Sequence, residues 1–396
     1  MNKVTVVGLG YVGLPTALNA AEAGYFVSGF DIDHVKISML ESGLTYIEDV
    51  SDIKIKSLLL NGHFKAFKDI NDIPESEIFL ICVPTPLDEL KLPDLTILLG
   101  AVELVGSALR KGNLVIVEST VEPGSVRELV VPLLEVKSKL SRDDFFVAFS
   151  PERIDPGRTD WNFSNIPKLV SGLTSRSLEL ALDFYSRFIK TTIPCSSLEV
   201  AETAKLLENS FRLINISFVN ELLILCNTLG IDVTEVINAA ATKPYGFMPF
   251  YPGLGAGGHC IPVDPVYLAE KAKKVGKPTK LIELATQINL EMPEFFVKLA
   301  EKKLKDLVGK KILVIGVAYK ANISDVRETP VESLIIGLKN KGAEVYWHDE
   351  FVKNWNGTTS EPLSSNFDLA ILATPHDYLD LSKLGKVPVI QTRGSI

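Results

Sequence analysis

The sequence is poor in cysteine, and its cysteines are scattered. The four thiols, Cys82, Cys195, Cys226 and Cys260, lie far apart and show no C-x-x-C spacing. That pattern disfavours both a zinc site and a disulfide framework. We therefore expect no bound metal, and free thiols in a reducing compartment such as the cytoplasm.

Long hydrophobic runs are also missing. No stretch of about 18 apolar residues is free of charge, so the sequence predicts no membrane-spanning helix. The residues after Met1 lack the small-residue cleavage site of a signal peptide. We expect a cytoplasmic protein that does not contact a membrane.

Positive charge is in deficit. Lysine and arginine number 41 against 49 aspartates and glutamates, which leaves a formal net charge of −8. A nucleic-acid-binding protein normally carries a basic surface, so this class is disfavoured. The 396 residues are enough for roughly two or three domains, and a hydrophobic content of 46% is that of an ordinary globular protein.

What the sequence does contain begins with a glycine motif. Residues 3–7 are rich in valine and predict a strand, and Gly8, Gly10 and Gly13 follow in the spacing G-x-G-x-x-G. Residues 15–23 predict a helix directly after it. Between a strand and a helix, this motif brings the backbone close to a pyrophosphate at the helix N-terminus. A strand-helix-strand unit that binds nothing is the alternative.

An acidic residue follows at the spacing that the motif requires. Residues 25–30 predict the next strand, which ends at Asp31, 18 residues beyond Gly13. Asp31 would accept a hydrogen bond from a ribose 2′-hydroxyl and repel a 2′-phosphate, so NAD is favoured over NADP. Asp33 competes for this role but lies past the end of the strand.

Two more strands are predicted at residues 78–83 and 114–118. Both are nearly continuous apolar runs, as in a parallel sheet covered on both faces. Ligands gather at the carboxyl ends of such strands, where Pro84, Thr85, Ser119 and Thr120 stand. A turn or helix-capping role is the alternative for Thr120. Cys82, inside an apolar strand, is predicted to be core.

A further strand at residues 145–149 leads into Ser150-Pro-Glu152-Arg153. Because catalytic groups of open α/β sheets lie at strand ends, Glu152 is a candidate general base or a residue that orients water. The alternative is a surface carboxylate beside Arg153.

Residues 198–229 contain neither Gly nor Pro, and apolar residues recur at intervals of three and four. We therefore predict one helix of roughly 30 residues. Lys205 and Asn209 share one of its faces, where an ammonium and an amide would stabilise a developing oxyanion. A solvated lysine is the alternative, and Cys226 is predicted to be core.

The segment 251–265 crowds glycines and prolines around one cysteine, Cys260. Gly reaches positive φ and Pro fixes φ, so a specially bent backbone is predicted. Such a loop has no use for a thiol as core filler, and Cys260 is our candidate nucleophile, with Asp264 managing a proton or a water. The alternative is a buried thiol in a tight turn. His259 is given no role, because adjacent side chains diverge.

A second strand-turn-helix series begins at residues 310–315 and continues at 343–347 and 369–373. It predicts another Rossmann-like sheet. The turn after its first strand, Gly316-Val-Ala-Tyr-Lys320, lacks the triple-glycine motif, so no second dinucleotide is expected there.

Seven motifs in order along the chain resemble those of the UDP-sugar 6-dehydrogenases. They are Gly8-x-Gly10-x-x-Gly13 with Asp31, Val83-Pro-Thr-Pro, Glu118-Ser-Thr120, Ser150-Pro-Glu152, Ala204-Lys205-Leu-Leu-Glu-Asn209, Gly257-Gly-His-Cys260-Ile-Pro-Val-Asp264-Pro and Gly316-Val-Ala-Tyr-Lys320. The likeness spans nearly the whole chain. It implies two Rossmann-like doubly wound α/β sheets joined by a long central helix and a helical middle domain. The domains implied are an NAD-binding domain at 1–197, a helical domain with the Cys260 loop at 198–305, and a UDP-sugar-binding domain at 306–396.

The resemblance implies an NAD-dependent, four-electron oxidation of C6 of a UDP-sugar through a thioester on Cys260. Catalytic residues would be Cys260, Lys205, Asn209, Asp264, Glu152 and Thr120. Cofactor-binding residues would be Gly8, Gly10, Tyr11, Val12, Gly13, Asp31, Lys36, Pro84, Thr85, Ser119, Thr120 and Arg327. Substrate-binding residues would be Glu152, Arg153, Ile154, Lys205, Asn209, Tyr251, Gly257, Tyr319, Lys320 and Arg393. It further implies a homodimer formed through the central helix and a role in surface-polysaccharide synthesis.

Within the family, Arg153-Ile-Asp-Pro-Gly and the segment from Lys243 to Gly253 most resemble UDP-N-acetylglucosamine 6-dehydrogenases. Pro156 stands where UDP-glucose enzymes carry a second Glu, and no Arg stands near Lys243 as in UDP-N-acetylmannosamine enzymes. Those two substrates remain alternatives. Ala321 stands where relatives have a second Lys, which affects contacts with UDP. A one-hydride dehydrogenase of the same layout and a noncatalytic UDP-sugar-binding protein are rivals of other classes.

Overall fold

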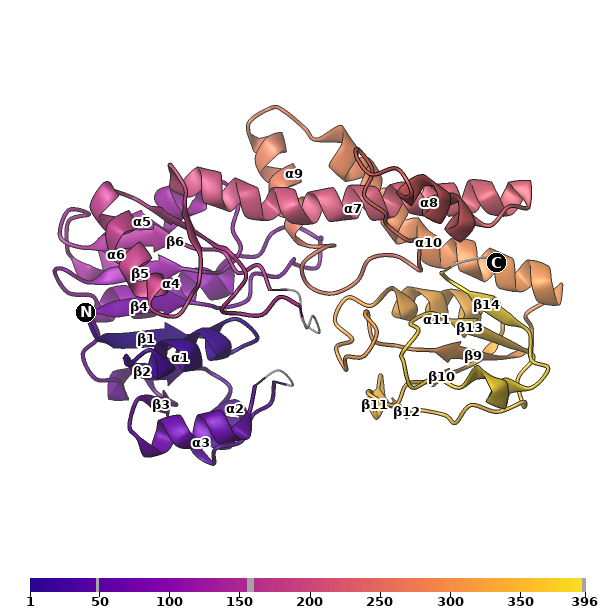
Figure 1. Cartoon of the computed structure of the whole chain (residues 1–396), viewed down its shortest axis with the longest axis horizontal. Coiled ribbons are helices and arrows are strands. Elements are labelled where there is room, and N and C mark those ends of the chain that lie inside the picture. Colours follow the sequence, from indigo (N-terminus) through magenta and orange to yellow (C-terminus); the bar gives the residue numbers. More distant parts are fainter. Residues whose placement is uncertain (48–49, 155–159, 394–396) are drawn as a thin grey trace. The chain divides into compact units, whose positions relative to one another are not determined.

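The computed structural model of the chain describes residues 1–47, 50–154 and 160–393 (Figure 1). The chain divides into two compact units, Met1–Leu207 and Glu208–Ile396. The boundary falls inside one long helix, α7 (Leu198–Leu229). The division into three domains, with boundaries near 197 and 305, stays a prediction. Residues 155–157, on which part of the substrate resemblance depends, lie outside the described residues.

The first unit is built on an eight-stranded sheet with the order β3-β2-β1-β4-β5-β6-β7-β8. Neighbouring strands are parallel except β6 and β7, which are antiparallel. The first six strands have the order of a dinucleotide-binding sheet, whose switch point lies between β1 and β4. The strands are β1 (Lys3–Val7), β2 (Phe26–Phe30), β3 (Phe64–Phe67), β4 (Ile78–Ile81), β5 (Leu114–Val117), β6 (Phe146–Phe149), β7 (Lys168–Gly172) and β8 (Thr192–Pro194).

Alternate residues of the central strands face opposite sides of this sheet. In β4, Leu80 is buried in one hydrophobic cluster, whereas its neighbours Phe79 and Ile81 are buried in another. A strand covered on both faces is apolar throughout, which explains the continuous runs of β4 and β5. The helices of this unit are α1 (Gly13–Glu22), α2 (His34–Glu41), α3 (Asp52–Leu60), α4 (Thr96–Ala108), α5 (Val131–Ser138) and α6 (Ser175–Ser186), with short turns η1 (Ile70–Asp72) and η2 (Val126–Val130).

Helix α7 has the bounds predicted from the sequence. Leu198 is buried in the core of the first unit, and Val219 and Leu223 are buried in that of the second. By length and mean hydropathy alone, α7 is the one helix of the described residues that meets the requirement for crossing a membrane. A long core helix of a globular protein meets the same requirement.

The second unit carries a four-stranded parallel sheet with the order β10-β9-β13-β14. Leu313 and Ile315 of β9 face one cluster and Ile312 and Val314 face another, so helices or loops cover both faces here too. Its elements are α8 (Val233–Ala241), α9 (Asp264–Lys274), α10 (Lys280–Leu304), β9 (Lys311–Ile315), α11 (Pro330–Asn340), β10 (Glu344–His348), the hairpin β11 (Asn354–Trp355) and β12 (Thr358–Thr359), β13 (Leu369–Leu372), η3 (Leu381–Leu384) and β14 (Val389–Gln391).

The predicted fold class is confirmed: two Rossmann-like sheets, a long helix and further helices between them along the chain. Strand ends differ from the prediction by one or two residues, as at β4, which ends at Ile81 rather than at 83. The carboxyl ends of β1, β4, β5 and β6 carry loops that the sequence singled out for chemistry, whereas the Cys260 loop lies between α8 and α9.

Candidate active site

The glycine-rich turn between β1 and α1 holds its three glycines for three different reasons. Gly8 has φ +91°, and a Cβ there would lie 2.7 Å from the carbonyl oxygen of Cys82. A Cβ on Gly13 would lie 1.8 Å from the carbonyl oxygen of Gly8. A Cβ on Gly10 would meet nothing within 4 Å. The open space at Gly10 is where a pyrophosphate approaches the backbone in such turns.

Asp31 stands at the end of β2, as the sequence predicted, and is buried. Its Oδ2 accepts the N–H of Leu9 at 2.9 Å, and Lys36 Nζ lies 3.6 Å away. Asp33 instead caps α2, since its carboxylate accepts the N–H of Val35. Asp31 is therefore the acidic residue that borders the glycine-rich turn and suits a ribose.

The other predicted cofactor residues border the same sheet. Ser119 Oγ donates to the carbonyl oxygen of Val83 at 2.7 Å, which ties the loops after β4 and β5 together. Thr120 and Thr85 are half-buried, and Tyr11 is 40% exposed. Val12 is half-buried and Pro84 is exposed. The residues present fit NAD at the switch point between β1 and β4.

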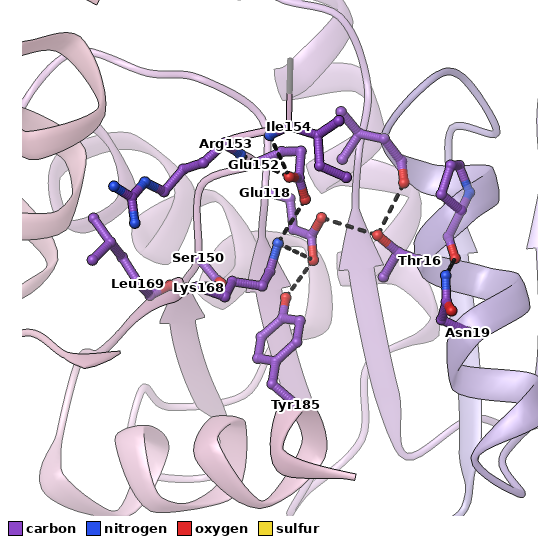
Figure 2. Close-up of polar contacts among 12 residues, drawn as sticks. Thr16, Asn19, Glu118, Ser150, Glu152, Arg153, Ile154, Lys168, Leu169 and Tyr185 are labelled. Atoms are coloured by element: carbon purple, nitrogen blue, oxygen red, sulfur yellow. Dashed lines mark hydrogen bonds and ion pairs between the residues drawn. The ribbon is translucent and has the colours of Figure 1, made fainter. Parts of the chain in front are cut away.

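Glu152 belongs to a buried cluster of charged side chains, drawn in Figure 2. Its Oε2 lies 3.0 Å from Lys168 Nζ, and its Oε1 accepts the N–H groups of Arg153 and Ile154 at 2.7 and 2.8 Å. Lys168 Nζ also lies 3.5 Å from Glu118 Oε1. Glu152 is thus a fixed carboxylate rather than a solvated surface group.

The charges in this cluster shift one another's pKa values. Burial alone would raise the pKa of Glu152, but the Lys168 ammonium and the hydrogen bonds outweigh it and hold that pKa below its usual value. Burial raises the pKa of Glu118, and Lys168 only partly offsets it. At neutral pH Glu152 is therefore a carboxylate, better suited to accept a hydrogen bond from water than to take up a proton.

The Cys260 loop has the bent backbone that its composition predicted. Gly255 has φ +126° and Gly258 has φ +79°. A Cβ on Gly257 would lie 2.8 Å from the Cβ of Tyr319, so the loop passes directly against that side chain. Cys260 is half-buried and forms no disulfide. It is therefore not core filler.

Two asparagines pin the main chain of this loop. Asn289 of α10 accepts the N–H of Ala256 at 2.6 Å through Oδ1, and its Nδ2 donates to the carbonyl oxygen of Ala256 at 3.1 Å. Asn220 of α7 accepts the N–H of Gly253 at 2.9 Å. These contacts hold the loop at two points before the cysteine.

After the cysteine the chain turns at once into α9. The carbonyl oxygen of Cys260 accepts the N–H of Asp264 at 2.8 Å, and Asp264 is the first residue of the helix. Asn209 Nδ2 donates to Asp264 Oδ2 at 2.6 Å, and both side chains are buried. The structure therefore brings the side chains of Asn209 and Asp264 together, and Cys260 lies one turn before Asp264 along the chain. Lys205 lies one helical turn before Asn209 on α7.

Two predicted ligand residues lie beside the loop. The carbonyl oxygen of Arg327 accepts the N–H of Gly258 at 3.1 Å. The Arg327 guanidinium donates to Asp325, with Nη2 to Oδ2 at 2.6 Å. Tyr319 covers Gly257 and Gly258. Because Arg327 is oriented by a carboxylate, its charge points in a defined direction.

Three further predicted substrate residues belong to the second unit. Tyr251 is 47% exposed, and its hydroxyl donates to Asn238 Oδ1 at 2.8 Å. A Cβ on Gly253 would lie 3.9 Å from Arg393 Nε, so this C-terminal cation borders the loop. Lys320 is half-buried.

In the second sheet, Asp349 stands at the strand end equivalent to that of Asp31 in the first sheet. Asp349, directly after β10, accepts the N–H groups of Val317 and Ala318 with Oδ2. His376 Nδ1 accepts the N–H of Asn322, so its Nε2 carries the proton and donates to Asp349 at 3.1 Å. Asp349 is therefore held by two backbone N–H groups and by His376, and all of these groups are buried.

Sequence reasoning missed several residues that hold these sites. Lys168, Tyr185, Asn220 and Asn289 carry no local motif, since each acts on a group far away in the sequence. Tyr46 donates to the carbonyl oxygen of Leu9 in the glycine-rich turn. Among the residues that the structure describes, no group of three or more His, Cys, Asp and Glu is arranged to hold a metal ion.

The glycine geometry predicts different outcomes for two alanine substitutions. Gly13→Ala forces its Cβ against the carbonyl oxygen of Gly8 and should lower the free energy of unfolding by about 1–3 kcal/mol. Gly10→Ala has space, so it should melt like the parent protein but bind NAD about tenfold more weakly or worse. Thermal melts and NAD titrations measure both. Unchanged NAD binding by Gly10→Ala would contradict the assignment.

Three family models match in succession and cover most of the chain. The NAD-binding domain of the UDP-glucose/GDP-mannose dehydrogenase family matches residues 2–189. The central domain of that family matches residues 199–291, and its UDP-binding domain matches residues 313–394.

Curated relatives match over nearly their whole length. The chain is 39% identical to a UDP-N-acetyl-D-glucosamine 6-dehydrogenase of Pseudomonas aeruginosa, over 97% of this chain and 94% of that protein. It is 35% identical to a UDP-N-acetyl-D-mannosamine dehydrogenase of Pyrococcus horikoshii, over 94% of this chain and 89% of that protein.

Solved structures agree. The structure of a UDP-D-ManNAc dehydrogenase from Pyrococcus horikoshii matches with a TM-score of 0.92 at 34% identity, over 99% of this chain and 95% of that chain. A UDP-glucose dehydrogenase from Pyrobaculum islandicum matches with a TM-score of 0.91 at 27% identity, over 99% and 94%. The chain therefore belongs to the UDP-glucose/GDP-mannose dehydrogenase family, and it is an NAD-dependent UDP-sugar dehydrogenase.

Proposed function

We propose that the chain oxidises the C6 hydroxyl of a UDP-sugar to a carboxylate in two successive steps. The observation that carries this proposal is a half-buried cysteine outside any disulfide, Cys260, in a loop whose main chain is held by Asn220 and Asn289. An alcohol becomes a carboxylate by losing four electrons, and NAD accepts only one hydride at a time. A thiol can bind the aldehyde covalently between the two hydride transfers, which gives the cysteine of this loop a function.

The covalent steps follow from this role of the thiol. C6 first loses a hydride while a base takes the hydroxyl proton, which gives an aldehyde. The Cys260 thiolate adds to the aldehyde carbon, and loss of a second hydride with the hydroxyl proton converts the thiohemiacetal into a thioester. Water adds to the thioester carbonyl, the C–S bond breaks, and Cys260 returns to the thiolate as the carboxylic acid leaves.

The polar residues of the site act on the charge that develops at C6. Lys205 and Asn209 share a helix face and supply an ammonium and an amide to the oxyanion, a role worth about 3 kcal/mol for one such donor. The hydrogen bond to Asp264 orients the amide of Asn209. Asp264 and Thr120 handle protons, and Glu152, held as a carboxylate, orients the water that attacks the thioester.

We assign UDP-N-acetylglucosamine as the preferred substrate, with UDP-N-acetylmannosamine and UDP-glucose as alternatives. The motifs around Arg153 and Lys243 and the relative from Pseudomonas aeruginosa favour the first. Relatives named for UDP-N-acetyl-D-mannosamine are similar to the chain at comparable identity. Initial rates with the three nucleotide sugars distinguish them, and a rate with UDP-N-acetylglucosamine below the other two would overturn this assignment.

Removal of the thiol should abolish acid formation. The parent protein should release two NADH for each UDP-sugar consumed, because both hydrides leave the same carbon. Cys260→Ala should form no acid, whereas Cys195→Ala, the matched change at the other half-buried thiol, should behave like the parent. Absorbance at the NADH band with chromatography of the sugar product measures both. Normal acid formation by Cys260→Ala would remove the thiol from the mechanism.

We further propose a homodimer formed through α7, working in the cytoplasm to supply a precursor of a surface polysaccharide. The dimer is supported by apolar side chains that share one face of α7 and remain exposed in the single chain. They are Leu207, Phe211, Phe218, Leu225 and Leu229, exposed by 46% to 62%. A continuous apolar stripe of this kind typically marks a protein interface.

The dimer proposal predicts a change of mass on one substitution. The parent protein should sediment as a dimer, and Phe218→Glu should sediment as a monomer because a charge would be buried in the interface. Leu281→Glu, on α10 at a similarly exposed position, is the control and should remain dimeric. Analytical ultracentrifugation gives the masses; a monomeric parent protein would refute the proposal.

A further inference from the structure

Glu152 shares a buried cluster with Lys168, Glu118 and Tyr185. We propose that Lys168 is a positioning residue: it fixes the carboxylate of Glu152 in one orientation, and Glu118 and Tyr185 hold Lys168 in place. The inference rests on the proposed role of Glu152 in orienting water. Lys168 itself touches neither substrate nor cofactor in this scheme.

Strand register brings Lys168 opposite Glu152. β6 and β7 pair antiparallel with Ala148 opposite Gly172 and Phe149 opposite Ser171. Three residues beyond Phe149 comes Glu152, and three residues before Ser171 comes Lys168. The single antiparallel pair of this sheet therefore delivers a lysine to the edge where the parallel strands end.

Both oxygens of Glu152 are engaged. Oε2 accepts from Lys168 Nζ at 3.0 Å, and Oε1 accepts two backbone N–H groups, from Arg153 and Ile154. The Arg153 guanidinium donates instead to the carbonyl oxygen of Pro167 at 2.8 Å. Figure 2 shows the guanidinium pointing away from Glu152. With three donors on two oxygens, the carboxylate has one orientation, and its one remaining lone pair, on Oε2, points in a fixed direction.

Lys168 is itself held from behind. Its ammonium lies 3.5 Å from Glu118 Oε1, and the hydroxyl of Tyr185 on α6 donates to that same oxygen. Glu118 Oε2 lies 3.3 Å from Thr16 Oγ1, which belongs to the first turn after the glycine-rich motif. The cluster therefore connects the cofactor helix α1 with the loop of Glu152.

Burying these charged side chains costs desolvation free energy, which the ion pairs only partly offset. The side chains of Lys168, Glu118 and Glu152 are only 4%, 0% and 12% exposed. Buried ion pairs are often replaceable by apolar side chains without loss of stability. Two carboxylates share one ammonium here, so one negative charge is left over; burial raises the pKa of Glu118, while that of Glu152 stays low.

The groups that face Glu152 define its pH dependence. They are Lys168 from β7, Glu118 after β5 and Cys82 after β4, while Tyr185 from α6 faces Glu118. Without the Lys168 ammonium, burial raises the pKa of Glu152. The acidic limb of the kcat profile should therefore move to higher pH than in the parent protein. Loss of the Glu118 charge acts in the opposite direction, because Lys168 then pairs with Glu152 alone.

The test compares Lys168→Met with Lys168→Arg and with Lys190→Met, a change at an exposed lysine of the same unit. Lys168→Met should lower kcat about 100-fold at pH 7, with the KM for NAD changed less than about threefold, and regain part of kcat at pH 9. Lys168→Arg should recover most of kcat, and Lys190→Met should match the parent. The proposal is overturned if a folded Lys168→Met variant has a kcat within threefold of the parent. It is also overturned if kcat falls by the same factor at pH 7 and at pH 9.

Glu118→Gln keeps the inference testable if Lys168→Met does not fold. The amide preserves shape, and the acidic limb of its kcat profile should move to lower pH than in the parent. A shift to higher pH, or none, contradicts the proposal. Circular dichroism melts identify which variants are folded.

Glu152→Gln separates this inference from the proposed function. If it turns over like the parent, Glu152 has no role in hydrolysis and both proposals about it fail. If it loses activity while Lys168→Met keeps it, only the positioning inference fails. If no UDP-sugar yields NADH with the parent protein, the proposed function fails regardless of Lys168.

Discussion

The hydrogen bonds that pin the main chain of the Cys260 loop are the constraint on which the site depends. A thiol on a glycine-rich segment would sample many positions, because glycine gives the backbone its largest conformational freedom. Asn289 binds both main-chain groups of Ala256, and Asn220 binds Gly253. The cost is visible in Asn220, whose buried Nδ2 has no hydrogen-bond partner among the described residues. A loop that accepts such a cost is built to present one side chain in one place.

The two sheets share one architecture but differ in the ligands that they suit. In the first, Gly10 is open and Asp31 borders the turn, so a dinucleotide fits. In the second, Asp349 stands at the equivalent strand end but is buried against His376. The same topology thus yields an NAD-binding unit and a unit whose match is to a UDP-binding domain. What differs is a few side chains at the strand ends, where α/β sheets generally carry their function.

Much of this was predictable, because the relevant signals are local. Strands buried on both faces are continuous apolar runs, and α7 is a long segment without Gly or Pro, so their positions follow from the sequence. The bent loop at Cys260 follows from its glycines. The support of the site was not predictable, because Lys168 reaches Glu152 only through the antiparallel pairing of β6 and β7. A lysine before an apolar run otherwise indicates a solvated strand end. The apolar stripe of α7 was equally ambiguous, since periodicity does not distinguish a core face from an exposed one.

The account as a whole depends on a covalent bond between Cys260 and the half-oxidised sugar. The direct measurement is mass spectrometry of the Cys260 peptide from the Glu152→Gln variant, quenched during turnover with UDP-N-acetylglucosamine and NAD. The account predicts an acyl adduct on that sulfur that hydroxylamine removes, as expected for a thioester. An unmodified Cys260 peptide while the uronic acid is still being formed would contradict it.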